Sequence, residues 1–238
     1  AEIMGLDAKI NKPTLDASTN IQFIIDILSP KDKKNPPKKF DLSIYNIVLR
    51  KSKLTYDVLS EPYIEGKFDK NHISLNNLKA DIALPRLRNN DFEINLKRVS
   101  FEEKSGFELS KLAANAHICD SLIAINGFRT DLPNSSIILS DFELKFNSLK
   151  TLGKEFKNID LNINTTGSYI TPSDLSAIAP VLSKLREPVK INVEVNGNMK
   201  SLNVRNLQLL TDRELIGLSI KGQIENVLEK DSLSVNLS

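Results

Sequence analysis

Apolar and polar residues alternate with a period of two over most of the chain from Asp41 onward. This pattern is typical of β-strands that bury one face and expose the other. Continuous apolar runs, which mark strands covered on both faces, do not interrupt it. We therefore expect a mainly β protein built on a long antiparallel sheet.

A sub-pattern recurs within the alternating segments. Two apolar residues one apart are followed by a two-residue polar step and then by further apolar residues at alternate positions. The copies are Leu42, Ile44, Ile47, Leu49; Ile73, Leu75, Leu78, Ala80; Phe107, Leu109, Leu112, Ala114; Ile123, Ile125, Phe128, Thr130; Ile137, Leu139, Phe142, Leu144; and Leu202, Val204, Leu207, Leu209.

Five of these six polar steps carry a residue that tolerates bulges and turns: Asn46, Asn77, Gly127, Asp141 and Asn206. An extra residue turns every later side chain to the other face unless the backbone bulges. We therefore predict a bulge at each step. Because repeated bulges bend a sheet, the predicted fold is a long curved antiparallel sheet, an open groove of the β-taco kind.

Turn-forming residues separate the alternating runs. The spacing between copies varies, which excludes a solenoid of fixed repeat length and favours a meander of long strands. The predicted turns are Asp69-Lys70-Asn71, Arg88-Asn89-Asn90-Asp91, Lys104-Ser105-Gly106 and Pro133-Asn134-Ser135.

Two short amphipathic helices are predicted outside this pattern. The first spans 20–28, with its apolar residues at helical spacing behind the candidate caps Ser18, Thr19 and Asn20. The second spans 171–185, with Thr171 as candidate cap, Pro172 in the first turn and a kink or split at Pro180. Its apolar stripe is expected to pack on the sheet or to plug the groove. The stripe comprises Leu175, Ile178, Ala179, Leu182 and Leu185.

Composition and charge exclude several classes of protein. The 238 residues are 40% hydrophobic and 26% charged, which argues against disorder. A net charge of +2 with dispersed basic residues argues against binding to nucleic acid. The basic run from Lys31 to Lys39 is broken by Pro36 and Pro37, so we interpret it as a solvated linker, with a membrane-headgroup contact as the alternative.

Catalytic and metal-binding motifs are missing from the sequence. Cys119 is the single cysteine, and neither His72 nor His117 stands in a metal-ligand spacing. No nucleophile elbow or phosphate-binding glycine loop occurs. The acidic pair Glu102 and Glu103 is expected to be solvated. We therefore predict a protein that is not an enzyme and that uses neither a cofactor nor a metal.

The alternating aliphatic residues leave two architectures open. If a second layer packs on the apolar face, these residues form an ordinary sandwich core. If nothing covers that face, they line a trough wide enough for lipid. Periodicity does not distinguish the two.

The order of several segments resembles the periplasmic repeats of the TamB/AsmA-like family. They are the stretch from Asn20 to Asp26, the linker and FDLSIYNIVLR from Phe40, then SYITPSDLSAIAPVL from Ser168, EPVKINVEVNG from Glu187 and LNVRNL from Leu202. The likeness covers essentially the whole chain. It rests on the order of the elements, because no single motif in it is as specific as a zinc-ligand pattern.

The resemblance implies a function and a compartment. Members of the family are anchored in the inner membrane of Gram-negative bacteria by an N-terminal helix and extend through the periplasm as β-taco rods with a hydrophobic interior. It therefore implies a non-enzymatic bridge that shields phospholipid acyl chains between the inner and outer membranes. The alternative is a scaffold for outer-membrane protein translocation and assembly by β-strand pairing. A BamA-like outer-membrane barrel would be a partner through regions outside this fragment.

We expect the chain to be a fragment with three segments. It begins without an initiator Met and ends within an alternating stretch, which suggests cuts in a longer protein. The expected segments are 1–40, with a strand, a short helix and a charged linker; 41–167, the repeating groove; and 168–238, a helix-capped AsmA-like repeat.

Nine aliphatic residues on the alternating positions are the candidates for contact with lipid in the groove. They are Leu75, Ile82, Ile94, Leu109, Ile125, Leu139, Leu144, Val193 and Val204.

Overall fold

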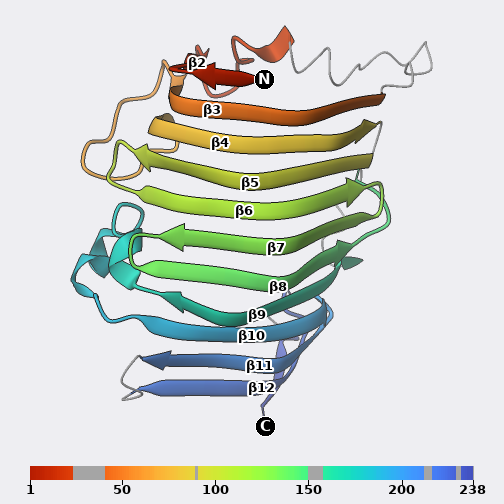
Figure 1. The fold of residues 1–238 in the computed structure, drawn as a ribbon. Helices are drawn as coiled ribbons and strands as arrows, with labels where there is room; N and C mark the ends of the chain where they lie inside the picture. Colours follow the sequence, from red (N-terminus) through yellow and green to blue (C-terminus); the bar gives the residue numbers. More distant parts are fainter. Residues whose placement is uncertain (24–40, 89–90, 150–157, 212–215, 229–231, 238) are drawn as a thin grey trace.

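The computed structural model describes residues 1–23, 41–88, 91–149, 158–211, 216–228 and 232–237. Its strands form one open sheet (Figure 1). They are β1 (Glu2–Met4), β2 (Asp7–Lys12), β3 (Asp41–Val58), β4 (His72–Arg88), β5 (Asp91–Glu103), β6 (Glu108–Cys119), β7 (Leu122–Leu132), β8 (Ser135–Lys145), β9 (Asp160–Ile170), β10 (Val189–Asn198), β11 (Ser201–Thr211), β12 (Gly217–Glu225) and β13 (Ser234–Leu237).

The sheet is an antiparallel meander from β3 to β13, in which every strand pairs with the next strand in sequence. At the other edge, β1 and β2 lie one after the other along β3, and both pair with it in parallel. The predicted mainly β, antiparallel fold is confirmed. Pairing runs without a break across the expected boundaries at residues 40 and 167, from the N-terminal strands to β13.

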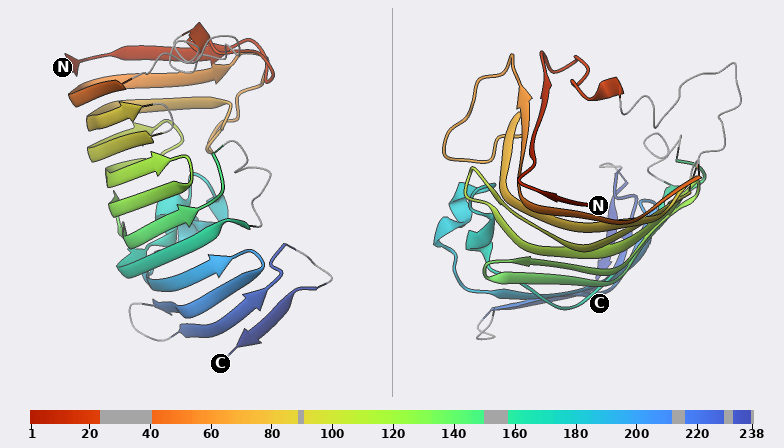
Figure 2. Two further views of the ribbon diagram at one scale, coloured as in Figure 1. Left: turned by 90° about the vertical axis from the view of Figure 1, so that its right-hand side faces the viewer. Right: turned by 45° about the horizontal axis from the view of Figure 1, so that its top comes forward.

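The strands bend along their length, so that the sheet forms a trough that runs across the strands (Figure 2). Bulges supply the bend, because the strand register shifts at each of the five steps whose residues are named above. The shifts lie between Ile44 and Ile47, between Asn76 and Lys79, opposite Gly127, between Leu139 and Asp141, and between Val204 and Leu207. Asn77 and Gly127 adopt positive φ angles of 50° and 61°, the left-handed conformation that Asn and Gly tolerate best.

Backbone hydrogen bonds identify the apolar face of the sheet as the concave one. The Val58 N–H donates to the Asn71 carbonyl on the β4 side, and the Phe146 N–H donates to the Ser121 carbonyl on the β7 side. In a strand of L-residues, the side to which the N–H points fixes the face that carries the side chain. For the strand directions drawn in Figure 1, this rule puts both side chains on the face turned away from the viewer. Figure 2 shows that the strands curve toward that face, so the face that carries the apolar side chains is concave.

The predicted helix at 171–185 is replaced by two 3-10 turns, η2 (Pro172–Leu175) and η3 (Pro180–Lys184). The split at Pro180 is confirmed, and Thr171 occupies the N-cap position of η2 with Pro172 in the first turn, as predicted. The Thr171 side chain forms no capping hydrogen bond, however, since its hydroxyl donates to the Asn134 carbonyl at 2.6 Å. The expected apolar stripe is not buried either, because Ile178 is 57% exposed. These turns lie at one end of the strands, so they do not plug the trough (Figure 2).

The predicted helix at 20–28 and the basic linker fall mostly outside the described residues. Within that helix the structure describes only 20–23, where Gln22 and Phe23 are helical. The predicted cap Asn20 instead bonds to β2, where its amide oxygen accepts the Asn11 N–H at 3.0 Å. Among the described helices, none is both long and apolar enough to cross a membrane.

Candidate functional groove

The concave face carries rows of apolar side chains that run across the sheet, with one residue from each strand that the row crosses. One row passes directly from strand to strand through Leu87, Phe92, Ile118, Ile123, Leu144 and Leu161. The next row passes through Ile94, Ala116, Ile125, Phe142, Ile163, Val195 and Val204. Because directly opposed residues of paired strands bring their side chains close together, each row forms a continuous apolar surface over the strands that it crosses.

The structure places all nine candidate residues on the concave face, four of them in the two rows above. Ile94, Ile125, Leu144 and Val204 belong to the two rows above. Ile82 faces Ile47 and Leu96, Leu139 faces Phe128, Val193 faces Leu207, Leu75 faces Leu54, and Leu109 faces Phe101. Their contact with lipid stays a prediction.

No second layer covers this face within the described parts of the chain. The substantial contacts between described elements are those between paired strands of the sheet and the contact of η2 with η3. Leu109 and Val204 are buried, at 8% and 6% exposed, and the other seven candidates are half-buried. Between the two architectures that the sequence left open, the described structure has an uncovered trough rather than a sandwich core.

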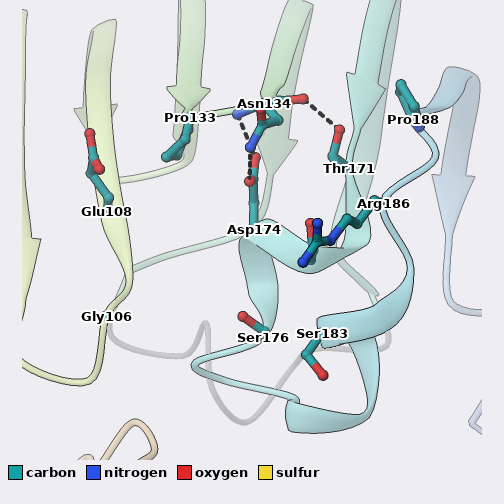
Figure 3. Close-up of a pocket in the computed structure, with 11 residues that line it drawn as sticks. Gly106, Glu108, Pro133, Asn134, Thr171, Asp174, Ser176, Ser183, Arg186 and Pro188 are labelled. Carbon is teal, nitrogen blue, oxygen red and sulfur yellow. Dashed lines mark hydrogen bonds between the residues drawn. The ribbon is translucent and has the colours of Figure 1, made fainter.

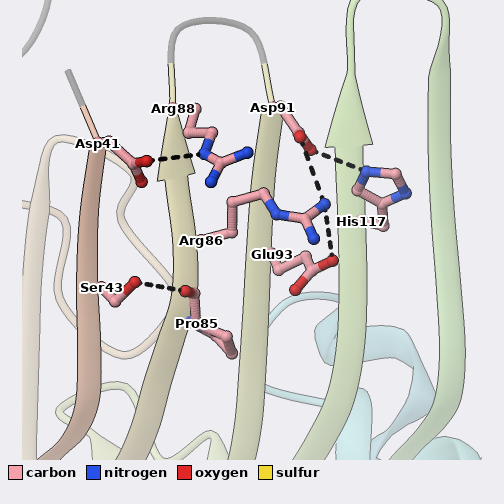
Figure 4. A network of polar contacts seen from close by, with 8 residues as sticks. All are labelled: Asp41, Ser43, Pro85, Arg86, Arg88, Asp91, Glu93 and His117. Carbon is pink, nitrogen blue, oxygen red and sulfur yellow. Dashed lines mark hydrogen bonds and ion pairs between the residues drawn. The ribbon is translucent and has the colours of Figure 1, made fainter. Parts of the chain in front are cut away.

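The convex face is polar and is held by ion pairs between strands (Figure 4). Arg86 on β4 contacts Asp91 at 3.3 Å and Glu93 at 3.1 Å, both on β5. His117 on β6 contacts Asp91 at 2.9 Å. The hydrogen bond from His117, with the nearby charge of Arg86, lowers the pKa of Asp91. His117, Asp91 and Glu93 therefore link neighbouring strands on the face opposite the trough.

Glu103 departs from the sequence expectation. It was expected to be solvated, yet it is only 4% exposed. Its carboxylate accepts the Ser74 N–H at 3.0 Å and the Ser105 N–H at 2.7 Å. Burial raises the pKa of Glu103, but the hydrogen bonds from Ser105 and Ser74 outweigh it, so the net shift is downward. Glu103 therefore ties the β5–β6 turn to β4.

His72 also has a structural role. Its two ring nitrogens lie 3.1 Å from an Asp57 carboxylate oxygen and 2.9 Å from the Glu61 carbonyl, so it joins the connection after β3 to the start of β4. Across the described ranges, no group of three or more His, Cys, Asp or Glu side chains is placed to hold a metal.

Sequence reasoning missed a polar cavity at one end of the strands, beside η2 and η3. Asp174, Arg186 and Glu108 line it together with turn residues of β7–β8. These residues come from distant parts of the chain, so no local motif announces them. Comparisons with protein-family models, curated protein sequences and solved structures gave no match.

Proposed function

We propose that this chain is a non-enzymatic segment that shields lipid acyl chains in its concave face during phospholipid transport between two membranes. The observation that carries the proposal is the continuous apolar surface across the sheet, with no described element packed over it. An uncovered apolar surface of this extent is typical of a binding surface rather than of a folded core.

The proposed ligand fits the chemistry of the two faces. Each methylene that an acyl chain buries contributes about 0.8 kcal/mol. A trough open along one side lets the headgroup stay in water while the chain is shielded. Bound lipid would then need no catalytic group and no cofactor.

The length of the trough favours passage over storage. Its longest path contains twelve strands in order. At about 4.8 Å per strand step, the trough is on the order of 50 Å long. Half of a bilayer's hydrocarbon core is roughly 15 Å thick. The two apolar rows cross six and seven of these strands, about 24 and 29 Å at the same spacing, so each is longer than a single acyl chain and offers a series of near-equivalent contacts.

The compartment and partners follow the TamB/AsmA-like resemblance. On that basis we propose the periplasm as the location, with the full-length protein anchored in the inner membrane of a Gram-negative bacterium. A BamA-like barrel would be contacted through regions outside this chain.

Native mass spectrometry of the purified chain tests the proposal. We expect phospholipid to co-purify with it, and Ile125→Arg to reduce the bound fraction at least about tenfold, because a charge on the apolar row costs more than the roughly 1.4 kcal/mol that corresponds to tenfold binding. Leu139→Glu should act in the same way.

The matched control is Asn162→Arg, which places the same side chain on the exposed polar face between Leu161 and Ile163. It should retain wild-type lipid, and thermal unfolding should show that every variant is folded. A wild-type chain that carries no lipid, or equal loading of Ile125→Arg and wild type, would contradict the proposal.

Strand pairing with a client protein is the second candidate function. The two described edges of the sheet differ in how open they are to such pairing. The Asn20 side chain and N–H bond to Lys9 and Asn11, which closes part of the free edge of β2. At the opposite edge, β13 pairs on one side only among the described strands. Crosslinks from β13 to an extended client peptide would favour this second candidate over lipid.

A further inference from the structure

A polar cavity of about 790 Å³ lies at one rim of the trough (Figure 3). It is bounded by the β5–β6 turn, the β7–β8 turn and the segment that contains η2 and η3. Three strands that reach it carry a residue of the concave apolar face near that end: Leu109, Leu132 and Ile170. The cavity therefore lies at the end of strands that carry the proposed lipid surface, next in sequence to these three residues.

The cavity wall is preorganised by Asp174. Its carboxylate accepts the Asn134 N–H at 2.8 Å, the Asn134 side-chain amide at 2.9 Å and the Ser135 hydroxyl at 2.6 Å. The Thr171 N–H also donates to the Ser135 hydroxyl oxygen at 2.9 Å. These bonds fix η2 against the β7–β8 turn, and they engage both oxygens of Asp174 with neutral donors.

Two further charges line the cavity without an opposite charge beside them. Arg186 is exposed and has no ion pair or hydrogen-bond partner among the described residues. Glu108 accepts a hydrogen bond from the Ser110 hydroxyl at 3.3 Å and forms no ion pair with any residue in the described ranges. Ser173, Ser176 and Ser183 also line the wall. Figure 3 shows Glu108 and Arg186 on different sides of Asp174.

The charge balance selects the class of ligand. The carboxylates of Asp174 and Glu108 repel a simple anion, and the guanidinium of Arg186 repels a simple amine, so neither ligand matches the charges that line the cavity. A ligand with a phosphate for Arg186 and an ammonium group for Glu108 satisfies both.

We propose that this cavity binds the zwitterionic headgroup of an ethanolamine phospholipid whose acyl chains lie on the adjoining apolar face. This inference rests on the proposed function and names the lipid class for it. Arg186 would donate to the phosphate oxygens, and Glu108 would accept the ammonium group.

The test uses glycerophosphoethanolamine, a soluble probe that has the headgroup but no acyl chains, titrated into the ¹⁵N-labelled chain and followed by NMR. We expect saturable shifts at Asn134, Ser173 and Ser176. Arg186→Gln and Glu108→Gln should each weaken binding at least about tenfold, the effect of losing one hydrogen bond to a charged group. Arg205→Gln, which lies outside the cavity and pairs with Glu194, should bind the probe as wild type does.

Inorganic phosphate and ethanolamine, titrated separately, should each bind at least tenfold more weakly than the probe. Equal binding of phosphate, no effect of Glu108→Gln, or no saturable shift would overturn the headgroup site. Uptake from mixed phosphatidylethanolamine and phosphatidylglycerol vesicles identifies the source of the headgroup. Arg186→Gln should remove the preference for phosphatidylethanolamine, and an unchanged preference would overturn the lipid assignment.

These results separate the two proposals. The probe contains no acyl chain. If it fails to bind, the headgroup site is overturned, but the proposed function is not, because acyl-chain loading is measured separately. Absence of loading from any vesicle overturns the proposed function, and with it the lipid source of the headgroup.

Discussion

Glu103 shows how a single residue stabilises the trough. Its position lies in the row of Leu75 on the apolar face, but its carboxylate is turned to two backbone N–H groups. A buried acceptor with charge-assisted bonds is costly to replace, because its donors would be left without partners. The neighbouring Glu102 is exposed and accepts a hydrogen bond from the Asn77 side chain at 3.0 Å.

We predict that Glu103→Gln lowers the free energy of unfolding by about 1.5–3 kcal/mol at neutral pH, the contribution of a hydrogen bond to a charged group. The folded pKa of Glu103 lies below the ordinary value of 4.5. The stabilisation is therefore complete above pH 4.5 and is lost as the pH falls through the folded pKa. Urea unfolding across this range measures it.

The control for this prediction is Glu102→Gln, which should change the free energy of unfolding by less than about 0.5 kcal/mol because it lies on the surface. A Glu103→Gln variant as stable as Glu102→Gln at pH 7 would show that the buried carboxylate does not tie the turn to β4. A difference between Glu103→Gln and wild type that persists unchanged at pH 3 would contradict the lowered pKa.

At the scale of the element, bulges keep every strand's aliphatic residues on the same face. In β7 the step at Gly127 lies between Ile125 and Phe128, and both face the trough because the register shifts there. A Cβ added at Gly127 would meet only the Asn115 side-chain amide, at an ordinary 3.6 Å. The position therefore needs a left-handed backbone and an extra residue rather than the absence of a side chain.

We predict that deletion of Gly127 destabilises the chain by about 3 kcal/mol or more, because one half of β7 must then turn its large apolar side chains to water. Gly127→Asn keeps the residue count and the left-handed conformation, so it should cost less than about 1 kcal/mol. Thermal and urea unfolding compare the two variants, and equal stability would refute a role for the bulge in setting the face.

The elements of this fold differ in how well the sequence predicts them. Strands, turns and bulges were predictable because alternation and its interruptions are local signals, as at Asn46 and Gly127. The prediction of a longer helix at 171–185 was wrong. Its apolar spacing is helical, but its structure depends on bonds between Asp174 and a turn 40 residues earlier in the chain. Local periodicity contains no information about that partner.

The burial of Glu103 and the open trough were beyond sequence reasoning for a similar reason. One donor to Glu103 lies 29 residues away on β4, across a strand pair whose register is set by the whole sheet. Whether an apolar face is covered depends on every other element of the fold, so both the sandwich core and the groove were compatible with periodicity alone.

At the scale of the whole molecule, the two faces of one sheet are chemically distinct. The convex face has polar and charged cross-strand pairs, including Asp41 with Arg88 at 3.1 Å (Figure 4). The concave face has the apolar rows. A trough with this division can shield acyl chains along its length while its outer surface stays hydrated.

The most direct test of the central claim is paramagnetic broadening of methyl NMR signals by a fatty acid that carries a nitroxide on its chain. We predict that the probe broadens Ile94, Ile125 and Val193 on the concave face much more strongly than Val48 and Ile138 on the convex face, because paramagnetic broadening falls steeply with distance. The same chain supplies both sets of methyl groups, so the comparison is internally controlled. Equal broadening of the two sets, or none on the concave face, would contradict the account.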